Sequence, residues 1–272
     1  MSELSLYITL ISFILFLYPW KYQKYCACAG WISLELSLIF DFPHYLKESN
    51  FIYPIFIILA IPFVYITVKR LINEDYSISR LTYAISIAYI LYAPFATIER
   101  VGNWLIGVVV SNIQIVLDYI GFDYHLTNFN VFYHNSLSVE IILGCTGIQA
   151  IVVLLGLISI VPSNWKQKAF LSIMTISSIF IANVFRNVYV IMAYTEQWHP
   201  WFQDQFSNPL DASFFWSHNV ICEVSALIIT IVISYIIFKM NISTLSILIQ
   251  IINVYYTDMR EIYRRLLTLK YK

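Results

Sequence analysis

The sequence predicts an all-α polytopic membrane protein with about seven transmembrane helices, a small extracytoplasmic β-hairpin and a cytoplasmic interfacial C-terminal helix. Hydrophobic residues make up 60% of the 272 residues and charged residues only 12%, whereas a soluble domain carries about 25% charge. Long stretches with almost no charge recur along the chain. Because the formal net charge is zero, bulk charge predicts no nucleic-acid partner.

Seven segments approach the roughly 20 apolar residues that a spanning helix needs. They cover residues 4–20, 26–41, 51–68, 81–98, 146–162, 169–190 and 218–238. We interpret the first as a retained helix, because it lacks the basic start and the small-residue cleavage site of a signal peptide. The second is the weakest, because it is short and contains Glu35.

The distribution of Lys and Arg indicates that a further apolar stretch, 101–120, lies along the membrane surface. In that arrangement 13 of the 16 Lys and Arg residues face the cytoplasm, with the N-terminus outside and the C-terminus inside. If the stretch spanned as an eighth helix, the early and late basic loops would lie on opposite sides of the membrane. Four polar residues also interrupt it, namely Ser111, Asn112, Gln114 and Asp118.

Two shorter segments have patterns of their own. In 121–143, apolar residues alternate with polar ones before and after a turn at His134–Ser136, which predicts a β-hairpin on the outer face. The stretch 243–256 is predicted to be an interfacial helix whose basic neighbours meet anionic lipid, or else a helix packed against the bundle. No repeat or linker divides the chain, so we expect one domain over 1–272 with a basic cytoplasmic tail at 239–272.

Cys145 lies in the stretch Leu-Gly-Cys-Thr-Gly-Ile, just before the fifth predicted span. The start of a helix offers free N–H groups and about half a positive charge, which favour a thiolate over a thiol. Gly144 and Gly147 would let a substrate backbone approach closely. An unreactive cysteine at a helix end is the alternative. We therefore treat Cys145 as a candidate nucleophile, and Gly144, Thr146 and Gly147 as candidate substrate contacts.

Arg186 lies about 17 residues into the sixth span, which is about 26 Å along the helix and near the outer boundary of the membrane. An arginine inside a membrane helix is costly and is therefore a candidate for function. Asn183 and Asn187 flank it and are predicted to orient the guanidinium or to contact substrate. The alternatives are contact with lipid headgroups or structural pairing with Glu35 or Glu223.

His218 opens the seventh span at the same predicted boundary, so Cys145, Arg186 and His218 are expected to meet there. A thiol, a permanent cation and an imidazole together favour an enzyme that forms a covalent thioester. No GxSxG or HExxH motif offers another nucleophile or a zinc site, and we expect no cofactor and no metal. The other three cysteines, Cys26, Cys28 and Cys222, are predicted to be structural.

These motifs resemble those of the exosortase/archaeosortase family. Gly144–Ile148 matches its Cys-(Ser/Thr)-Gly-Ile motif, Asn183–Asn187 matches Asn-x-x-Arg, and Ser217–Asn219 supplies a third residue at the start of the next helix. The resemblance covers about 100–238, which would form the catalytic core. Archaeosortases are known for an arginine at the third position, whereas this chain has His218. The subfamily and its sorting signal therefore stay open.

The resemblance implies a membrane cysteine transpeptidase. Its substrates would be exported proteins that end in a short motif, a transmembrane helix and a basic cluster. Cleavage would leave an acyl-thioester on Cys145, and a membrane acceptor such as an amine-bearing lipid would take the acyl group. Arg186 and His218 would share oxyanion stabilisation and proton donation at the extracytoplasmic face of the cell membrane.

Two rival functions are open at this point. A small transporter or receptor would use Arg186 and Glu223 as intramembrane charges. A transport path needs polar groups across the membrane, however, and the inner halves of the neighbouring helices are apolar. An intramembrane cysteine protease would share the thioester and would use water as the acceptor.

Overall fold

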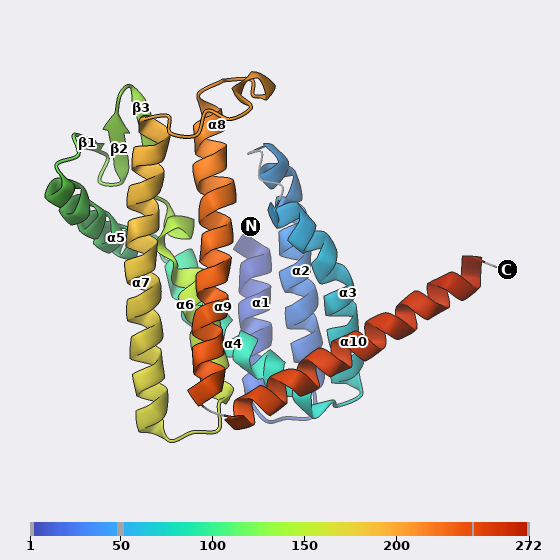
Figure 1. Ribbon diagram of the computed structural model, residues 1–272. Helices are drawn as coiled ribbons and strands as arrows, with labels where there is room; N and C mark the ends of the chain where they lie inside the picture. The colour runs from blue at the N-terminus through green and yellow to red at the C-terminus, as the bar shows by residue number, and fades with distance from the viewer. Residues whose placement is uncertain (1–2, 48–51, 241, 271–272) are drawn as a thin grey trace. The chain divides into compact units, whose positions relative to one another are not determined.

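The computed structural model describes residues 3–47, 52–240 and 242–270 and is mostly helical (Figure 1). Its α-helices are α1 (Glu3–Leu17), α2 (Gln23–Lys47), α3 (Ile52–Ile72), α4 (Tyr76–Thr97), α5 (Glu99–Ile120), α6 (Ile148–Ile160), α7 (Trp165–Thr195), α8 (Asp211–Phe214), α9 (Glu223–Met240) and α10 (Ile242–Lys270). The described residues also form the 3₁₀ turns η1 (Leu143–Thr146) and η2 (Gln203–Gln205) and the π-helix η3 (Phe215–Cys222). The strands β1 (His125–Thr127), β2 (Val131–His134) and β3 (Leu137–Glu140) make one antiparallel sheet.

Five stretches of the described chain are long and apolar enough to cross a membrane, which confirms the predicted class of mainly α-helical membrane protein. They are Gln23–Pro43, Pro54–Ile72, Glu99–Ile120, Trp165–Thr195 and Asp211–Ile237, beside the shorter apolar helices Leu4–Leu17 and Ile148–Ile160. Such stretches fold as helices because only a helix satisfies its own backbone polar groups in lipid. Helix α4 covers all but the last residue of the predicted span 81–98 but is not among the five. The count of seven spans and their orientation stay predictions, and residue 51 of the third lies outside the described residues.

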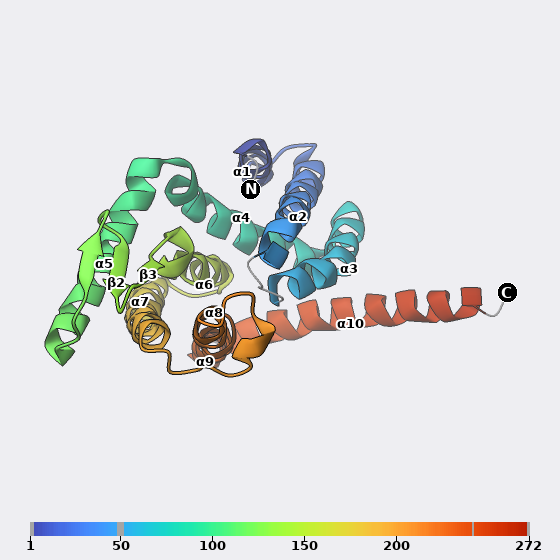
Figure 2. The same ribbon diagram turned by 90° about the horizontal axis from the view of Figure 1, so that it is seen from above.

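For helix α5, two sequence criteria disagree about whether the helix spans the membrane. Its length and composition admit it as a span, whereas the distribution of Lys and Arg predicts a helix on the membrane surface. In Figure 2 α7 is seen nearly end-on while α5 is seen along its length, so α5 crosses the direction of α7. This course is the one expected of a surface helix beside a spanning α7, and the surface position stays a prediction.

The chain forms two compact units, which we describe separately. Unit 1 comprises Met1–Ile90, Leu155–Lys168 and Ile236–Lys272, and unit 2 comprises Leu91–Leu154 and Ala169–Tyr235. The expectation of one domain over 1–272 stays a prediction.

Aromatic side chains fill the interior of unit 1 where α1, α2 and α4 meet. The fully buried Phe13 ring lies edge-on to the rings of Trp31 and Tyr89, with centroids 6.3 and 5.7 Å away. Trp31 Nε1 donates to Thr82 Oγ1 at 3.0 Å, which satisfies the polar atom of the buried indole. Gly30 is required beside this cluster, because a Cβ there would lie 2.5 Å from the Phe13 ring.

Helix α10 packs along α3, which favours the second of the two predictions for the tail. Tyr255 stacks on Phe63 with ring centroids 4.5 Å apart. Asp258, only 3% exposed, accepts two hydrogen bonds from Arg70 at 2.6 and 2.8 Å. The Arg70 guanidinium holds the pKa of Asp258 below its ordinary value. Contact of the tail with anionic lipid stays a prediction, and residues 241 and 271–272 lie outside the described part.

The predicted hairpin is confirmed by β2 and β3, which pair antiparallel. Asn135 and Ser136 connect them with φ angles of 49° and 63°, the left-handed conformation that a two-residue hairpin turn requires. Strand β1 pairs along the other edge of β2. The sequence did not predict it, because three residues are too few to show a strand period.

In unit 2 the sheet, α5 and α7 share one hydrophobic core. Phe132 of β2 is fully buried in this core, together with Ile113 of α5 and Ile191 of α7. Cys145 packs at the edge of the same core. The packing therefore fixes the turn that carries Cys145 relative to α7.

Candidate catalytic site

Cys145 lies in η1, separated from the start of α6 by Thr146 and Gly147. It is half-buried, and its backbone N–H already donates to the Ile142 carbonyl at 2.8 Å. The cysteine thus lies just before a helix, as predicted, but on a 3₁₀ turn of its own. Gly144 beside it is exposed, with open space where a Cβ would stand.

Two buried asparagine side chains of α7 hold the backbone of Cys145. Asn183 Nδ2 and Asn187 Nδ2 donate to the Cys145 carbonyl at 2.7 and 2.8 Å. Residues four apart in a helix lie on one face, so the two amides form a fork, which we call the asparagine fork. Its partner is the cysteine backbone, and the predicted contact of Asn183 and Asn187 with substrate stays a prediction.

The two residues after the cysteine serve the local structure. The buried Thr146 hydroxyl donates to the Leu143 carbonyl at 2.7 Å and accepts from the Ile148 N–H at 3.3 Å, which bonds η1 to the start of α6. Gly147 has a φ of 76°, and a Cβ at this position would lie 3.1 Å from the Asn183 side chain. Glycine is therefore needed for both the turn and the fork. Contacts of Thr146 and Gly147 with substrate stay predictions.

Arg186 of α7 faces His218 of η3. Arg186 Nη2 lies 3.4 Å from His218 Nε2, and His218 Nδ1 lies 2.8 Å from Asn219 Oδ1. Because an amide oxygen only accepts, these partners place the imidazole proton on Nδ1 and make Nε2 an acceptor. Phe214 stacks on the imidazole, with centroids 4.9 Å apart and planes 7° apart. The ring is thus held in one tautomer and one orientation.

The π-helix η3 brings a second cysteine to Arg186. π-Helices are rare in proteins, and those that do occur are often found at functional sites. Cys222 ends this helix, is 2% exposed, and lies close to the Arg186 guanidinium. The sequence predicts only packing for Cys222 and gives no sign that it lies near Arg186, because nothing in the local sequence predicts a π-helix. Asn219 was missed as well, although its place next to His218 was a usable signal.

One donor of Arg186 has no partner in the described part of the chain. The Nε–H group is buried and makes no hydrogen bond there. A buried donor without a partner costs roughly 1–3 kcal/mol. An acceptor oxygen that arrives with a substrate would relieve this cost, which suits a guanidinium that stabilises an oxyanion.

The two halves of the site are connected through α7. Cys145 is bound to Asn183 and Asn187, and His218 is bound to Arg186, which lies between them in the sequence. Among the described residues, no hydrogen bond joins the Cys145 sulfur to Arg186 or His218. The structure therefore places each predicted catalytic residue on or against one helix.

Comparison with known proteins decides the family. The sequence model of the family described as transmembrane exosortase, EpsH type, matches residues 2–218, which include all three predicted catalytic residues. The chain belongs to the exosortase family. It is therefore a multi-pass membrane protein of a family of processing enzymes, peptidases or transpeptidases that act on C-terminal sorting signals.

Two curated relatives of this exosortase are archaeosortases. Archaeosortase A of Natronomonas pharaonis is 24% identical over 76% of this chain and 72% of its own length. Archaeosortase A of Haloferax volcanii is 21% identical over 77% of this chain and 78% of its own length. No solved structure matches the chain.

Proposed function

We propose that this exosortase is a cysteine transpeptidase with Cys145 as its nucleophile and with Arg186 and His218 as its catalytic partners. The asparagine fork carries the proposal, because it holds the Cys145 carbonyl at 2.7 and 2.8 Å on the helix that also carries Arg186. A fixed position speeds the reaction of a nucleophile, whereas a cysteine that only packs in a core does not need two side chains to hold its backbone. Membership of a family of processing enzymes argues against the transporter or receptor alternative.

In the proposed acylation, the Cys145 thiolate attacks the scissile carbonyl of the substrate. A carbon–sulfur bond forms, and the carbonyl oxygen becomes an oxyanion that accepts from the unpartnered Nε–H of Arg186. The oxyanion then collapses and the peptide C–N bond breaks. Before the attack His218 takes the proton of the Cys145 thiol at Nε2, its accepting nitrogen, and it later passes this proton to the leaving amine.

In the proposed second step, an acceptor amine attacks the thioester. The amine gives one proton to His218, an amide bond forms and the carbon–sulfur bond breaks, and the departing sulfur takes the proton from His218, which returns Cys145 to the thiol. We propose exported proteins with a C-terminal motif, a transmembrane helix and a basic cluster as substrates, and an amine-bearing membrane lipid as the acceptor. The distribution of Lys and Arg supports an active site at the extracytoplasmic face, with the C-terminus in the cytoplasm.

Intact-mass analysis of both proteins tests this function after co-expression with an exported protein that carries such a C-terminal signal. We expect an acyl adduct on the Cys145 peptide and a product heavier than the cleaved chain by the mass of the acceptor. Cys222→Ala is the matched control, because it removes the other thiol near Arg186, and it should still form the adduct.

Other results would change the conclusion. A product with a free carboxylate would assign the hydrolytic protease in place of the transpeptidase. Normal processing by Cys145→Ala, or an adduct on another residue, would exclude the cysteine mechanism.

A further inference from the structure

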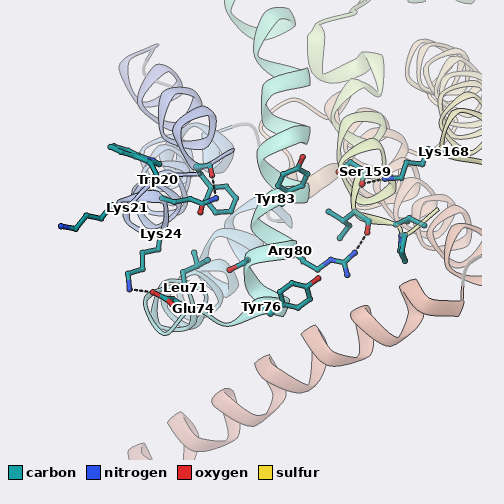
Figure 3. A pocket seen from close by; sticks show the side chains of 16 residues that line it. Trp20, Lys21, Lys24, Leu71, Glu74, Tyr76, Arg80, Tyr83, Ser159 and Lys168 are labelled. Carbon is teal, nitrogen blue, oxygen red and sulfur yellow. Dashed lines mark hydrogen bonds and ion pairs between the residues drawn. The ribbon is translucent and has the colours of Figure 1, made fainter. Parts of the chain in front are cut away.

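Unit 1 contains a cavity of about 900 Å³ that the proposed chemistry does not use (Figure 3). It is lined by the C-terminal ends of α1, α3 and α6 and by the N-terminal ends of α2, α4 and α7, together with the loops that join them. Sites for small ligands have volumes of roughly 300–1,000 Å³. We call it the basic cavity, after the lysine and arginine side chains that line it.

Cations outnumber carboxylates in the lining. Lys21, Lys24, Arg80 and Lys168 line the cavity and Glu74 is the one carboxylate of its described lining, which leaves a formal charge of +3. Lys24 donates to Glu74 at 2.8 Å and holds the pKa of that carboxyl below its ordinary value. Within the described part of the chain, Lys21, Arg80 and Lys168 have no carboxylate partner.

Two of these cations are held in place by the end of α6. Arg80 Nη2 donates to the Ile160 carbonyl, and Lys168 Nζ donates to the Ser159 carbonyl at 2.6 Å. The last carbonyls of a helix lack partners within it and carry about half a negative charge in total. Half a charge does not neutralise two full ones, so capping α6 accounts for the positions of Arg80 and Lys168 but leaves excess positive charge.

The other side chains and their place along the helices point to a lipid. Trp20, Tyr76 and Tyr83 line the cavity and are exposed, and Trp and Tyr gather where lipid headgroups meet the hydrocarbon. Lys24 and Leu71 lie at the ends of two candidate spans. If these stretches span the membrane, the cavity lies at the depth where lipid phosphates are found.

We propose that the basic cavity binds the phosphate headgroup of an anionic membrane lipid. Arg80 and Lys168 meet the phosphate, and the aromatic side chains contact the glycerol and the first carbons of the lipid chain. Figure 3 shows Arg80 and Lys168 beside the end of α6, with Tyr76 and Tyr83 next to Arg80, whereas Lys21 extends away from these side chains and Lys24 points to Glu74. This site goes beyond the proposed transpeptidase function and does not depend on it.

Ligand titration of the purified full-length protein in neutral detergent tests the proposal. Short-chain phosphatidylglycerol is compared with phosphatidylcholine of the same chains and with inorganic phosphate, using native mass spectrometry and thermal unfolding. We expect phosphatidylglycerol to bind at least about tenfold more tightly than either. The double variant Arg80→Gln/Lys168→Gln should lose about tenfold or more of that affinity, whereas Cys145→Ala should keep it.

Lys166→Gln is the matched control, because Lys166 lies two residues from Lys168, stands over the Trp165 ring at 5.9 Å, and does not line the cavity. It should change the affinity by less than about twofold. If inorganic phosphate bound as tightly as phosphatidylglycerol, the ligand would be a soluble phosphate compound and the proposal of a lipid would be wrong. An unaffected double variant, or an equal loss in Lys166→Gln, would show attraction by general surface charge and overturn the site.

Discussion

The candidate catalytic site of unit 2 and the basic cavity of unit 1 each contain a half-buried arginine, but different groups hold it. Arg186 contacts the His218 imidazole and lies close to the Cys222 thiol, and both of these side chains belong to one π-helix. Arg80 donates to a backbone carbonyl at the end of α6. A helix end accepts any nearby cation, whereas ring and thiol partners constrain the direction of the guanidinium. We infer that the site depends on geometry and the cavity on charge.

The largest expected effect is the loss of the nucleophile. Cys145→Ala should lower substrate processing by about 10³-fold or more, because removal of a nucleophile ends covalent catalysis. Cys222→Ala, which removes the other thiol of the site, should keep processing within about threefold. Processing of a co-expressed substrate, corrected for the amount of enzyme in the membrane, measures both. Equal losses would mean that the two thiols share one role and would remove the distinction between them.

The next effect compares the two arginines directly. Arg186→Lys should lower processing by about 10²-fold, because an ammonium on a flexible stem does not reproduce the direction of the guanidinium donors. Arg80→Lys keeps the charge and should keep phosphatidylglycerol affinity within about twofold. If Arg186→Lys retained full activity, the direction of the guanidinium donors would not matter at Arg186, and the site would depend on charge as the cavity does.

A smaller effect is expected from the asparagine fork. Asn187→Ala removes one of the two bonds to the Cys145 carbonyl and should lower processing by about tenfold, and Asn183→Ala by a similar factor. Asn112→Ala is the control, since Asn112 donates to the Val108 carbonyl of its own helix at 2.8 Å. Initial processing rates decide the outcome. If neither fork variant differed from Asn112→Ala, the fork would have no part in positioning the nucleophile.

The smallest effect on processing is expected from α10 in unit 1. Asp258→Asn should weaken the packing of α10 on α3 by about 1–3 kcal/mol and should leave processing within about twofold. Because Arg70 lowers the pKa of Asp258 in the folded state, its stabilisation is present above the ordinary value of 3.8 and is lost as pH falls through the lowered folded value. Hydrogen exchange of the α10 backbone amides measures the loss of packing. Glu261→Gln is the control, because the Glu261 side chain is more exposed than that of Asp258.

The sequence was sufficient for properties that depend on short stretches. Apolar length and charge content predicted the membrane class, and strand alternation around His134–Ser136 predicted the hairpin. The motifs around Cys145 and Arg186 predicted the family that the comparison then showed. The role of Asn183 and Asn187 was different, because a bond between residues 38 or 42 positions apart leaves no local pattern.

By itself, the sequence determined that this chain is a multi-pass exosortase and which few residues are candidates for its chemistry, since composition and short motifs carry that information. Only the tertiary structure decided how these residues are held. The core shared by the sheet, α5 and α7 brings the Cys145 turn against the asparagine fork, and the π-helix turns His218 and Cys222 toward Arg186. Both depend on packing between distant segments, and packing is a property of the folded chain.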